Sequence, residues 1–197
     1  MSTPNPLLER LGFANDARLV IFHADDVGMC HGSNRAYLEL HEAGILKTGS
    51  LMVPCPWSHE MLAVCSQRPD LDIGVHLTLN SEWANYRWGP VSTRAWDSGL
   101  VDERGCFWPL VAATAAALDP QAALAELRAQ IDIVRAAGVQ FTHLDTHMLS
   151  ALLPELFYAY VELGFEYNVP VLVMRQLDDY TRVFNTVGID DAEWERF

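Results

Sequence analysis

The chain has 197 residues, of which 50% are hydrophobic and 20% are charged, and its formal net charge is −13. This size and composition predict a single globular domain over residues 1–197. The negative charge argues against nucleic acid and anionic membrane surfaces as partners, because both would repel the chain.

The N-terminal stretch MSTPNPLLERLGF lacks the basic and apolar regions of a secretory signal. The longest run of small apolar residues, VAATAAAL, is too short to cross a bilayer. Four scattered cysteines form no C-x-x-C pair, which is typical of reduced thiols. We therefore expect a cytoplasmic protein without a membrane partner, and homo-oligomer formation stays open.

Short apolar runs alternate with helical patterns over the first 80 residues. Residues 17–24 (ARLVIFHA) predict a buried strand, and residues 48–54 (TGSLMVP) and 71–79 (LDIGVHLTL) predict two more. Residues 34–44 (NRAYLELHEAG) predict a helix between the first two strands. Residues 57–68 (WSHEMLAVCSQR) predict a second helix, which follows a proline.

A long segment, residues 80–110, is rich in Trp, Tyr, Gly and Pro and has little periodicity. Loops of this length within a domain are usually functional. A clear amphipathic helix follows, with Asp119 as its N-cap, Pro120 in its first turn and Gly138 as its end.

The last third of the chain continues the same alternation. Residues 141–147 (FTHLDTH) predict a fourth strand, a helix follows Pro154, and residues 169–175 (VPVLVMR) predict a fifth strand. Strands that alternate with helices indicate a parallel sheet covered by its crossover helices. The fold class expected is therefore α/β.

Residues that can bind metal or move protons fall at the ends of four predicted strands. They are Asp25 and Asp26 in the first, His76 in the third, His143, Asp145 and His147 in the fourth, and Arg175 in the fifth. Because the carboxyl ends of parallel strands meet at one edge, we expect one site there.

The spacing of His143, Asp145 and His147 places these side chains on one face of an extended strand. Two imidazoles and a carboxylate form a common facial set for a divalent metal. A cation would also stabilise the adjacent Asp25 and Asp26, one as a ligand and one free to act as a base. Each residue taken alone has a structural explanation, such as a turn or a hydrogen-bonded core histidine.

Three aromatic residues, Trp83, Tyr86 and Trp88, lie close together in the long segment. Aromatic faces pack well against the C–H faces of sugar rings, so Trp83 and Trp88 are candidate substrate-binding residues. The alternative is that these rings fill the core beneath the loop. His23 is predicted to pack, or to support the site indirectly.

Three motifs, HADDVG, DIGVHLTLN and THLDTHM, resemble in this order the YdjC-like (ChbG) carbohydrate deacetylases, over residues 18–175. The resemblance implies a distorted (β/α) barrel of the YdjC-like and polysaccharide deacetylase type. It also implies a hydrolase that removes acetyl groups from N-acetylated sugars or oligosaccharides. The expected cofactor is one divalent metal ion, Mg²⁺ or Zn²⁺.

The resemblance also implies residue roles. Asp26, His76 and His147 match the metal ligands of the family, and Asp25 matches its general base. His143 and Asp145 would then orient the ligands through hydrogen bonds. Arg175 would hold Asp25 ionised or contact the substrate.

The sequence departs from the family in three respects. The third motif reads DTHMLSA, with Leu149 and Ala151 where many members carry further histidines, which predicts a less polar pocket. A complete (β/α) barrel needs about 250 residues, so we expect a barrel incomplete at its C-terminus. The late His-Pro motif that could supply a general acid in the family is absent here.

Two other interpretations stay open at this stage. The same ligands suit another metal enzyme on a similar barrel, such as a phosphoester hydrolase or a non-haem iron oxygenase. A non-catalytic domain that binds metal or glycan would also carry them.

Overall fold

A computed structural model describes residues 6–176, 178–180 and 182. Its centre is a four-stranded parallel sheet in the order β1-β2-β3-β4. The strands are β1 (His23–Val27), β2 (Thr48–Leu51), β3 (Asp72–Leu77) and β4 (Leu144–Thr146). The α/β class with parallel strands is confirmed.

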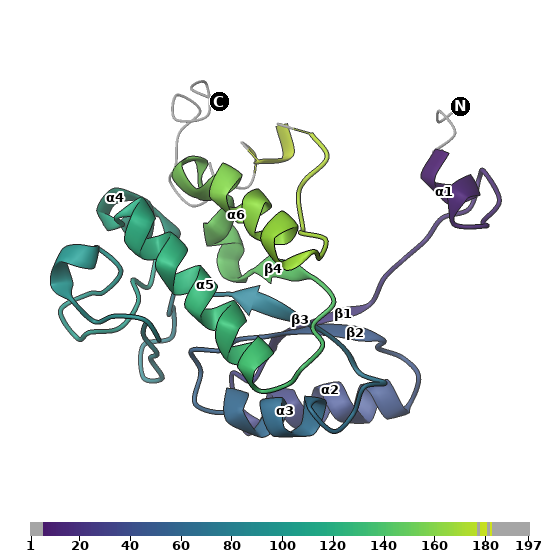
Figure 1. Cartoon of the computed structure of the whole chain (residues 1–197), viewed down its shortest axis with the longest axis horizontal. Coiled ribbons are helices and arrows are strands. Elements are labelled where there is room, and N and C mark those ends of the chain that lie inside the picture. Colours follow the sequence, from purple (N-terminus) through teal and green to yellow (C-terminus); the bar gives the residue numbers. More distant parts are fainter. Residues whose placement is uncertain (1–5, 177, 181, 183–197) are drawn as a thin grey trace.

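Helices connect the strands and cover the sheet. They are α1 (Pro6–Arg10), α2 (His31–Glu42), α3 (Ser58–Cys65), α4 (Val111–Ala117), α5 (Pro120–Ala136) and α6 (Pro154–Tyr167), with the short 3₁₀ helices η1 (Trp96–Ser98) and η2 (His147–Leu152). Figure 1 shows α2 and α3 together beside β1 and β2, and α5 and α6 together nearer β3 and β4. Consecutive parallel strands joined by helices form the βαβ unit that the alternating pattern predicted.

The first predicted strand is displaced in the structure. Residues 17–22 form no strand, and β1 begins only at His23. The apolar side chains of residues 19–22 are 48–79% exposed, so the prediction that this run is buried was wrong. The physical reason is pairing: β2 meets β1 from His23 onward, and no described strand lies beside the residues before it. In Figure 1 this segment leads out to α1, which stands apart from the sheet.

Most of the other predicted elements are present, with different limits. The helix after Asp119 is α5, and the Asp119 side chain accepts a hydrogen bond from the Ala122 N–H at its first turn. The fifth predicted strand, residues 169–175, is reduced to one parallel bridge between Val171 and Leu144. Helix α4 was not predicted, because its alanine-rich sequence has no amphipathic period.

Two buried polar residues on α5 fix the end of β3 and the long loop after it. The Gln130 side chain donates to the Thr78 carbonyl (2.8 Å) and accepts from the Thr78 N–H (2.9 Å). The Glu126 carboxylate is fully buried and accepts from the backbone N–H groups of Val91 and Ser92, at 3.0 and 2.8 Å. These bonds satisfy backbone groups that sheet pairing leaves open, so α5 anchors the loop near the carboxyl end of the sheet.

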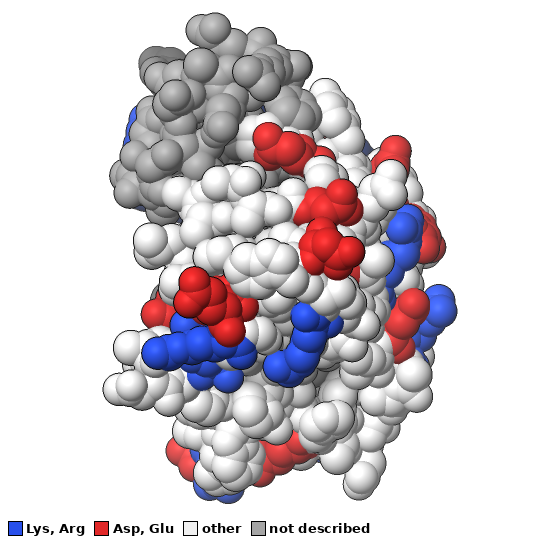
Figure 2. All heavy atoms as spheres, turned by 90° about the vertical axis from the view of Figure 1, so that its left-hand side faces the viewer, with Lys and Arg blue, Asp and Glu red and all other residues white. Residues whose placement is uncertain are grey.

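The surface offers no uniform charge on the face seen in Figure 2, where acidic and basic side chains are interspersed. Among the described residues, no helix combines the length and the apolar character that a membrane span requires.

Replacement of the anchoring carboxylate tests its role. Glu126→Ala removes the acceptor for the loop N–H groups and should lower the free energy of unfolding by about 1–3 kcal/mol. Chemical denaturation measures this change. The control Glu162→Ala, at an exposed position on α6, should change it by less than about 0.5 kcal/mol. Equal effects of the two variants would contradict an anchoring role for Glu126.

Candidate metal centre and active site

The adjacent aspartates sit at an irregularity of β1. The pairing register with β2 shifts between Ala24 and Val27, and Asp26 adopts a left-handed backbone conformation with φ of 59°. A bulge of this kind redirects side chains that regular alternation would send to opposite faces. Asp25 and Asp26 can therefore both serve one site at the carboxyl edge of the sheet.

Three side chains from distant parts of the chain converge at this edge. Each of Asp26, His76 and His147 offers one ligand atom, and these atoms all lie within 4.8 Å of one another. Asp26 Oδ1 is 3.1 Å from His147 Nδ1 and 3.4 Å from His76 Nε2. Both imidazoles are buried, whereas the carboxylate of Asp26 is partly exposed. The structure thus brings together the three residues that the family resemblance singled out.

In each imidazole, the nitrogen that points away from Asp26 lies within hydrogen-bonding distance of another carboxylate. His76 Nδ1 lies 2.8 Å from Asp145 Oδ1, and Ser50 Oγ donates to Asp145 Oδ2 at 2.8 Å. His147 Nε2 lies 2.9 Å from Glu82 Oε2. A carboxylate that accepts the far N–H of a histidine fixes the ring and leaves the near nitrogen as a ligand. Both imidazoles of these pairs contact the same oxygen of Asp26.

Unusual backbone conformations surround the cluster. Besides Asp26, Met148 and Leu149 have positive φ values of 51° and 59°, directly after His147. A bulky side chain in this region costs about 1–2 kcal/mol. Strain of this kind persists where the surrounding structure enforces it, and here it kinks the chain within η2, directly after His147.

The cluster is strongly coupled electrostatically. Burial opposes charge on Asp26, but hydrogen bonds from His147 and His76 outweigh it and hold the pKa of Asp26 well below its usual range. Burial also opposes charge on His76, yet its hydrogen bonds with Asp145 and Asp26 raise the pKa of His76 to about 9. The pKa of His147 is raised in the same way by Asp26 and Glu82, against the effect of burial. Positive charge on or between the imidazoles would therefore balance the carboxylates.

Asp25 lies beside this cluster and faces solvent. Its side chain is 66% exposed, and Oδ1 is 2.9 Å from His23 Nδ1. The hydrogen bond from His23 lowers the pKa of Asp25, so the carboxylate is ionised at neutral pH. His23, predicted to pack or to act indirectly, is thus a direct partner of Asp25.

His143 lies farther from the cluster than spacing alone suggested. Its Nε2 is 3.0 Å from His23 Nε2, and its Nδ1 is 2.8 Å from Thr142 Oγ1. Strand β4 ends at Thr146, so the regular alternation that would align His143, Asp145 and His147 does not extend over all three. Asp145 holds His76, as the family resemblance implied, whereas His143 contacts His23 instead of a ligand in the cluster.

The predicted substrate-binding residues differ in their placement. Trp83 is 53% exposed, whereas Trp88 is 3% exposed and donates its indole N–H to the Asn80 carbonyl at 2.7 Å. The Trp88 ring centroid lies 6.1 Å from that of His147 in an edge arrangement, so Trp88 packs behind the site. Arg175 is exposed, and within the part of the chain that the structure describes no hydrogen bond or ion pair joins it to Asp25.

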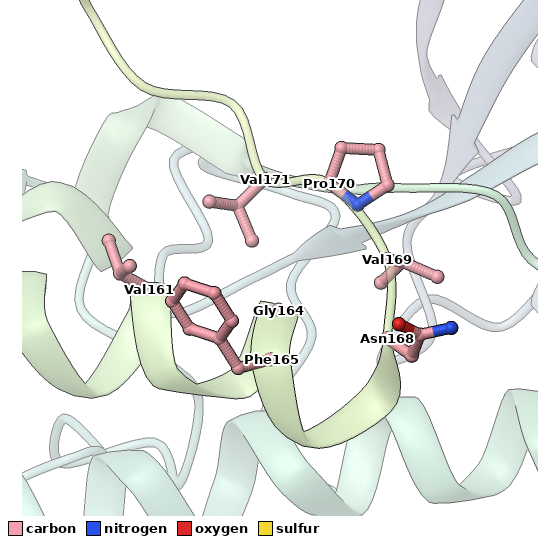
Figure 3. A pocket seen from close by; sticks show the side chains of 7 residues that line it. All are labelled: Val161, Gly164, Phe165, Asn168, Val169, Pro170 and Val171. Carbon is pink, nitrogen blue, oxygen red and sulfur yellow. The ribbon is translucent and has the colours of Figure 1, made fainter.

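Two hollows of similar size lie near this end of the molecule. One has a volume of about 420 Å³ and contains the side chains of His23, Asp25, His143 and Asp145 among its lining residues. The other, shown in Figure 3, has a volume of about 410 Å³ and is lined by Val161, Gly164, Phe165, Asn168, Val169, Pro170 and Val171. The second hollow holds no titratable side chain. The first contains Asp25, but Asp26, His76 and His147 are not among the residues that line either hollow.

Sequence reasoning missed two contributors to the site, Glu82 and Ser50, and left the role of His23 open. Glu82 lies in the long irregular segment, where the only candidates that the sequence indicated were aromatic residues. Ser50 lies in the middle of an apolar strand and carries no motif of its own. The i, i+2 spacing of His23 and Asp25 was a usable signal, because it places both on one face of β1.

Comparison with known proteins shows which family the chain belongs to. Residues 19–193 match the model of the YdjC-like protein family. A carbohydrate deacetylase of Thermus thermophilus is 37% identical over 174 residues, which are 87% of this chain and 59% of that protein. A carbohydrate deacetylase of Thermoanaerobacter pseudethanolicus is 32% identical over 154 residues, 78% of this chain and 59% of that protein.

A crystal structure of similar fold comes from Enterococcus faecalis, of a protein described provisionally as a cellobiose-phosphate cleavage protein. It superimposes with a TM-score of 0.71 and 26% identity, covering 85% of this chain and 64% of the other. The fold and the convergent polar cluster define an α/β protein with a candidate metal centre at the carboxyl edge of its sheet. The chain belongs to the YdjC-like family. It spans about 59% of the length of the two curated relatives.

The glycine of the GVH sequence has a specific packing role that can be tested. A Cβ at Gly74 would overlap the imidazole ring of His143. Gly74→Ala should therefore displace this ring and lower the free energy of unfolding by about 1–3 kcal/mol.

Urea denaturation measures the effect, and Gly32→Ala is the matched control. The nearest atom to a Cβ at Gly32 is Cys30 Sγ at 3.6 Å, an ordinary contact, and the position lies in the first turn of α2. This control should keep or raise the stability, by up to about 1 kcal/mol. An unchanged free energy of unfolding in Gly74→Ala would contradict the close packing of His143 on β3.

Proposed function

We propose that this chain carries the catalytic centre of a metal-dependent carbohydrate deacetylase, which hydrolyses the acetamide of N-acetylated sugars. The proposal rests chiefly on one observation: Asp26, His76 and His147 converge within 4.8 Å of one another beside an ionised, exposed Asp25. Membership of the YdjC-like family and the two deacetylase relatives support the same activity.

The donor set fits a divalent cation. Two imidazole nitrogens and one carboxylate oxygen meet, and both imidazoles are oriented from behind by Asp145 and Glu82. Such a set suits Zn²⁺ or another borderline metal better than Mg²⁺, which prefers oxygen ligands. When bound, the cation would polarise the acetyl oxygen and make a water molecule more acidic.

Asp25 is proposed as the general base. Its carboxylate is ionised because His23 donates to Oδ1, and its exposure leaves it accessible to water and substrate. It would take a proton from the attacking water and return it during breakdown of the tetrahedral intermediate. No described residue is assigned as a separate general acid.

Carbohydrate recognition is assigned to the loop after β3. Trp83 is exposed, and it follows Glu82, which holds His147. An aromatic face at this position can stack on a sugar ring next to the reacting acetamide. Arg175, also exposed, is the second proposed substrate contact. Trp88 is not a proposed substrate contact, because it is buried.

The decisive experiment is an acetate-release assay on acetylated mono- and oligosaccharides, after defined reloading with Zn²⁺ or Mg²⁺. Metal-dependent release of acetate supports the proposal. Phosphate release from phosphoesters, or oxygen consumption with Fe²⁺, would favour the alternative metal enzymes. Glycan binding without release would favour a binding domain. Homo-oligomer formation and a cytoplasmic location also stay predictions.

Two substitutions should separate metal binding from proton transfer. Asp25→Asn keeps the shape of the base but cannot accept a proton, so we expect turnover to fall by at least about 10²-fold with metal content unchanged. His147→Ala removes a ligand, so metal content itself should fall. Elemental analysis and the acetate assay measure the two effects. Full activity of Asp25→Asn, or full metal content of His147→Ala, would contradict the assigned roles.

Metal affinity should depend on pH in a defined direction. The pKa of His76 is raised to about 9 and that of His147 is raised as well, so these imidazoles hold protons more tightly than free histidine does, and a cation must displace those protons. Each displaced proton makes the apparent affinity rise about tenfold per pH unit below the pKa of its imidazole.

Calorimetry in buffers of different ionisation enthalpy counts the protons released. About one to two protons should leave per cation at neutral pH. The His147→Ala variant should release fewer protons for each cation that it binds. Binding without proton release would contradict the ligand assignment.

A further inference from the structure

A second polar cluster lies next to the proposed metal centre and shares none of its three ligands. His23, His143 and Asp145 each offer one ligand atom, and these atoms all lie within 4.8 Å of one another. His23 Nε2 is 3.0 Å from His143 Nε2 and 3.7 Å from Asp145 Oδ2. All three residues line the hollow of about 420 Å³.

The hydrogen bonds of the two imidazoles determine which nitrogens carry protons. The exposed carboxylate of Asp25 accepts, so His23 Nδ1 donates to it at 2.9 Å. In a neutral imidazole the other nitrogen, Nε2, is then a bare acceptor.

The same reasoning applies to His143. The Thr142 hydroxyl donates its single proton to the carboxylate of Asp72, so its oxygen accepts from His143 Nδ1 at 2.8 Å. His143 Nε2 is therefore also a bare acceptor. Asp145 Oδ2, which accepts from Ser50 Oγ, is the third acceptor, so with both rings neutral no proton lies between His23 Nε2, His143 Nε2 and Asp145 Oδ2.

We propose that these residues form a second cation site, which binds a borderline divalent metal such as Zn²⁺ through His23 Nε2, His143 Nε2 and Asp145 Oδ2. Three converging acceptors repel one another unless a positive charge lies between them. Zn–N bonds of about 2.0–2.1 Å in a tetrahedral site place neighbouring ligand atoms about 3.3 Å apart. The two distances of 3.0 and 3.7 Å bracket this value.

The surroundings of the three ligand atoms also fit a metal site. Asp25 and Thr142 orient the two rings from behind, as hydrogen-bonded partners do at metal centres. The hollow provides access, and its other walls are largely apolar, including Ile21 and Leu172. Asp145 joins the two sites, since its Oδ1 holds His76 and its Oδ2 faces His23.

The test counts bound metal rather than activity. The full chain is stripped with a chelator, equilibrated with excess Zn²⁺, dialysed and measured by elemental analysis. We expect two equivalents in the wild type. His23→Asn keeps an N–H near the position of Nδ1 for Asp25 but lacks Nε2, so it should bind one equivalent. His143→Asn keeps an N–H near the position of Nδ1 for Thr142 but lacks Nε2, so it should also bind one equivalent.

Two further variants make the result specific. His31→Ala removes an exposed imidazole that pairs with Glu60 outside both clusters, and it should keep two equivalents. His147→Ala should lose only the equivalent of the first site. Circular dichroism confirms that each variant is folded.

The possible results separate this inference from the proposed function. One equivalent in the wild type that survives in both asparagine variants would overturn the second site. Two equivalents retained in both asparagine variants would also overturn it. One equivalent that is lost in these variants, but kept in His147→Ala, would support the second site and contradict the first.

Discussion

The site depends on one interaction, the approach of two buried imidazoles to the carboxylate of Asp26. His147 Nδ1 and His76 Nε2 lie 3.1 and 3.4 Å from the same oxygen, and each ring is held from behind by a further carboxylate. Buried charges are costly unless they are paired, so this cluster can exist only with protons or a cation between its members. The rest of the fold near the carboxyl edge serves to hold these groups together.

Several features of the backbone contribute to that arrangement. The register shift in β1 brings both aspartates to the edge, and the positive φ values after His147 redirect the chain into η2. Helix α5 anchors the long loop through Glu126, and that loop carries Glu82 to His147. The geometry of the cluster thus depends on residues far from it, as expected where a rigid sheet supports functional loops.

The strand pattern predicted the α/β class, the central strands and one polar site at the carboxyl edge, because parallel strands bring their carboxyl ends to one edge whatever the details of pairing. The choice of Asp26, His76 and His147 within that site came from the family resemblance, and the structure brings these three residues together. The prediction of a buried strand was wrong for residues 19–22, because an apolar run forms a strand only if a neighbouring strand pairs with it, and pairing is a long-range property. Glu82 could not be found from periodicity, because its position depends on a loop anchored by α5.

The role of His23 could not be predicted from the sequence, for a different reason. Alternation along β1 correctly turns it away from Asp26, yet the same alternation places it beside Asp25 and opposite His143. Its significance emerges only from the count of donors and acceptors around three side chains, which requires the structure. The two clusters share Asp145, so the polar edge of the sheet is one connected network rather than a set of separate ligands.

Crystallography with anomalous scattering at the zinc edge tests the central claim most directly. A crystal of the Zn²⁺-loaded chain should give an anomalous peak at bonding distance, about 2.0–2.2 Å, from Asp26, His76 and His147. Zinc found only at surface residues, with His76 and His147 still hydrogen-bonded to Asp26, would contradict the account.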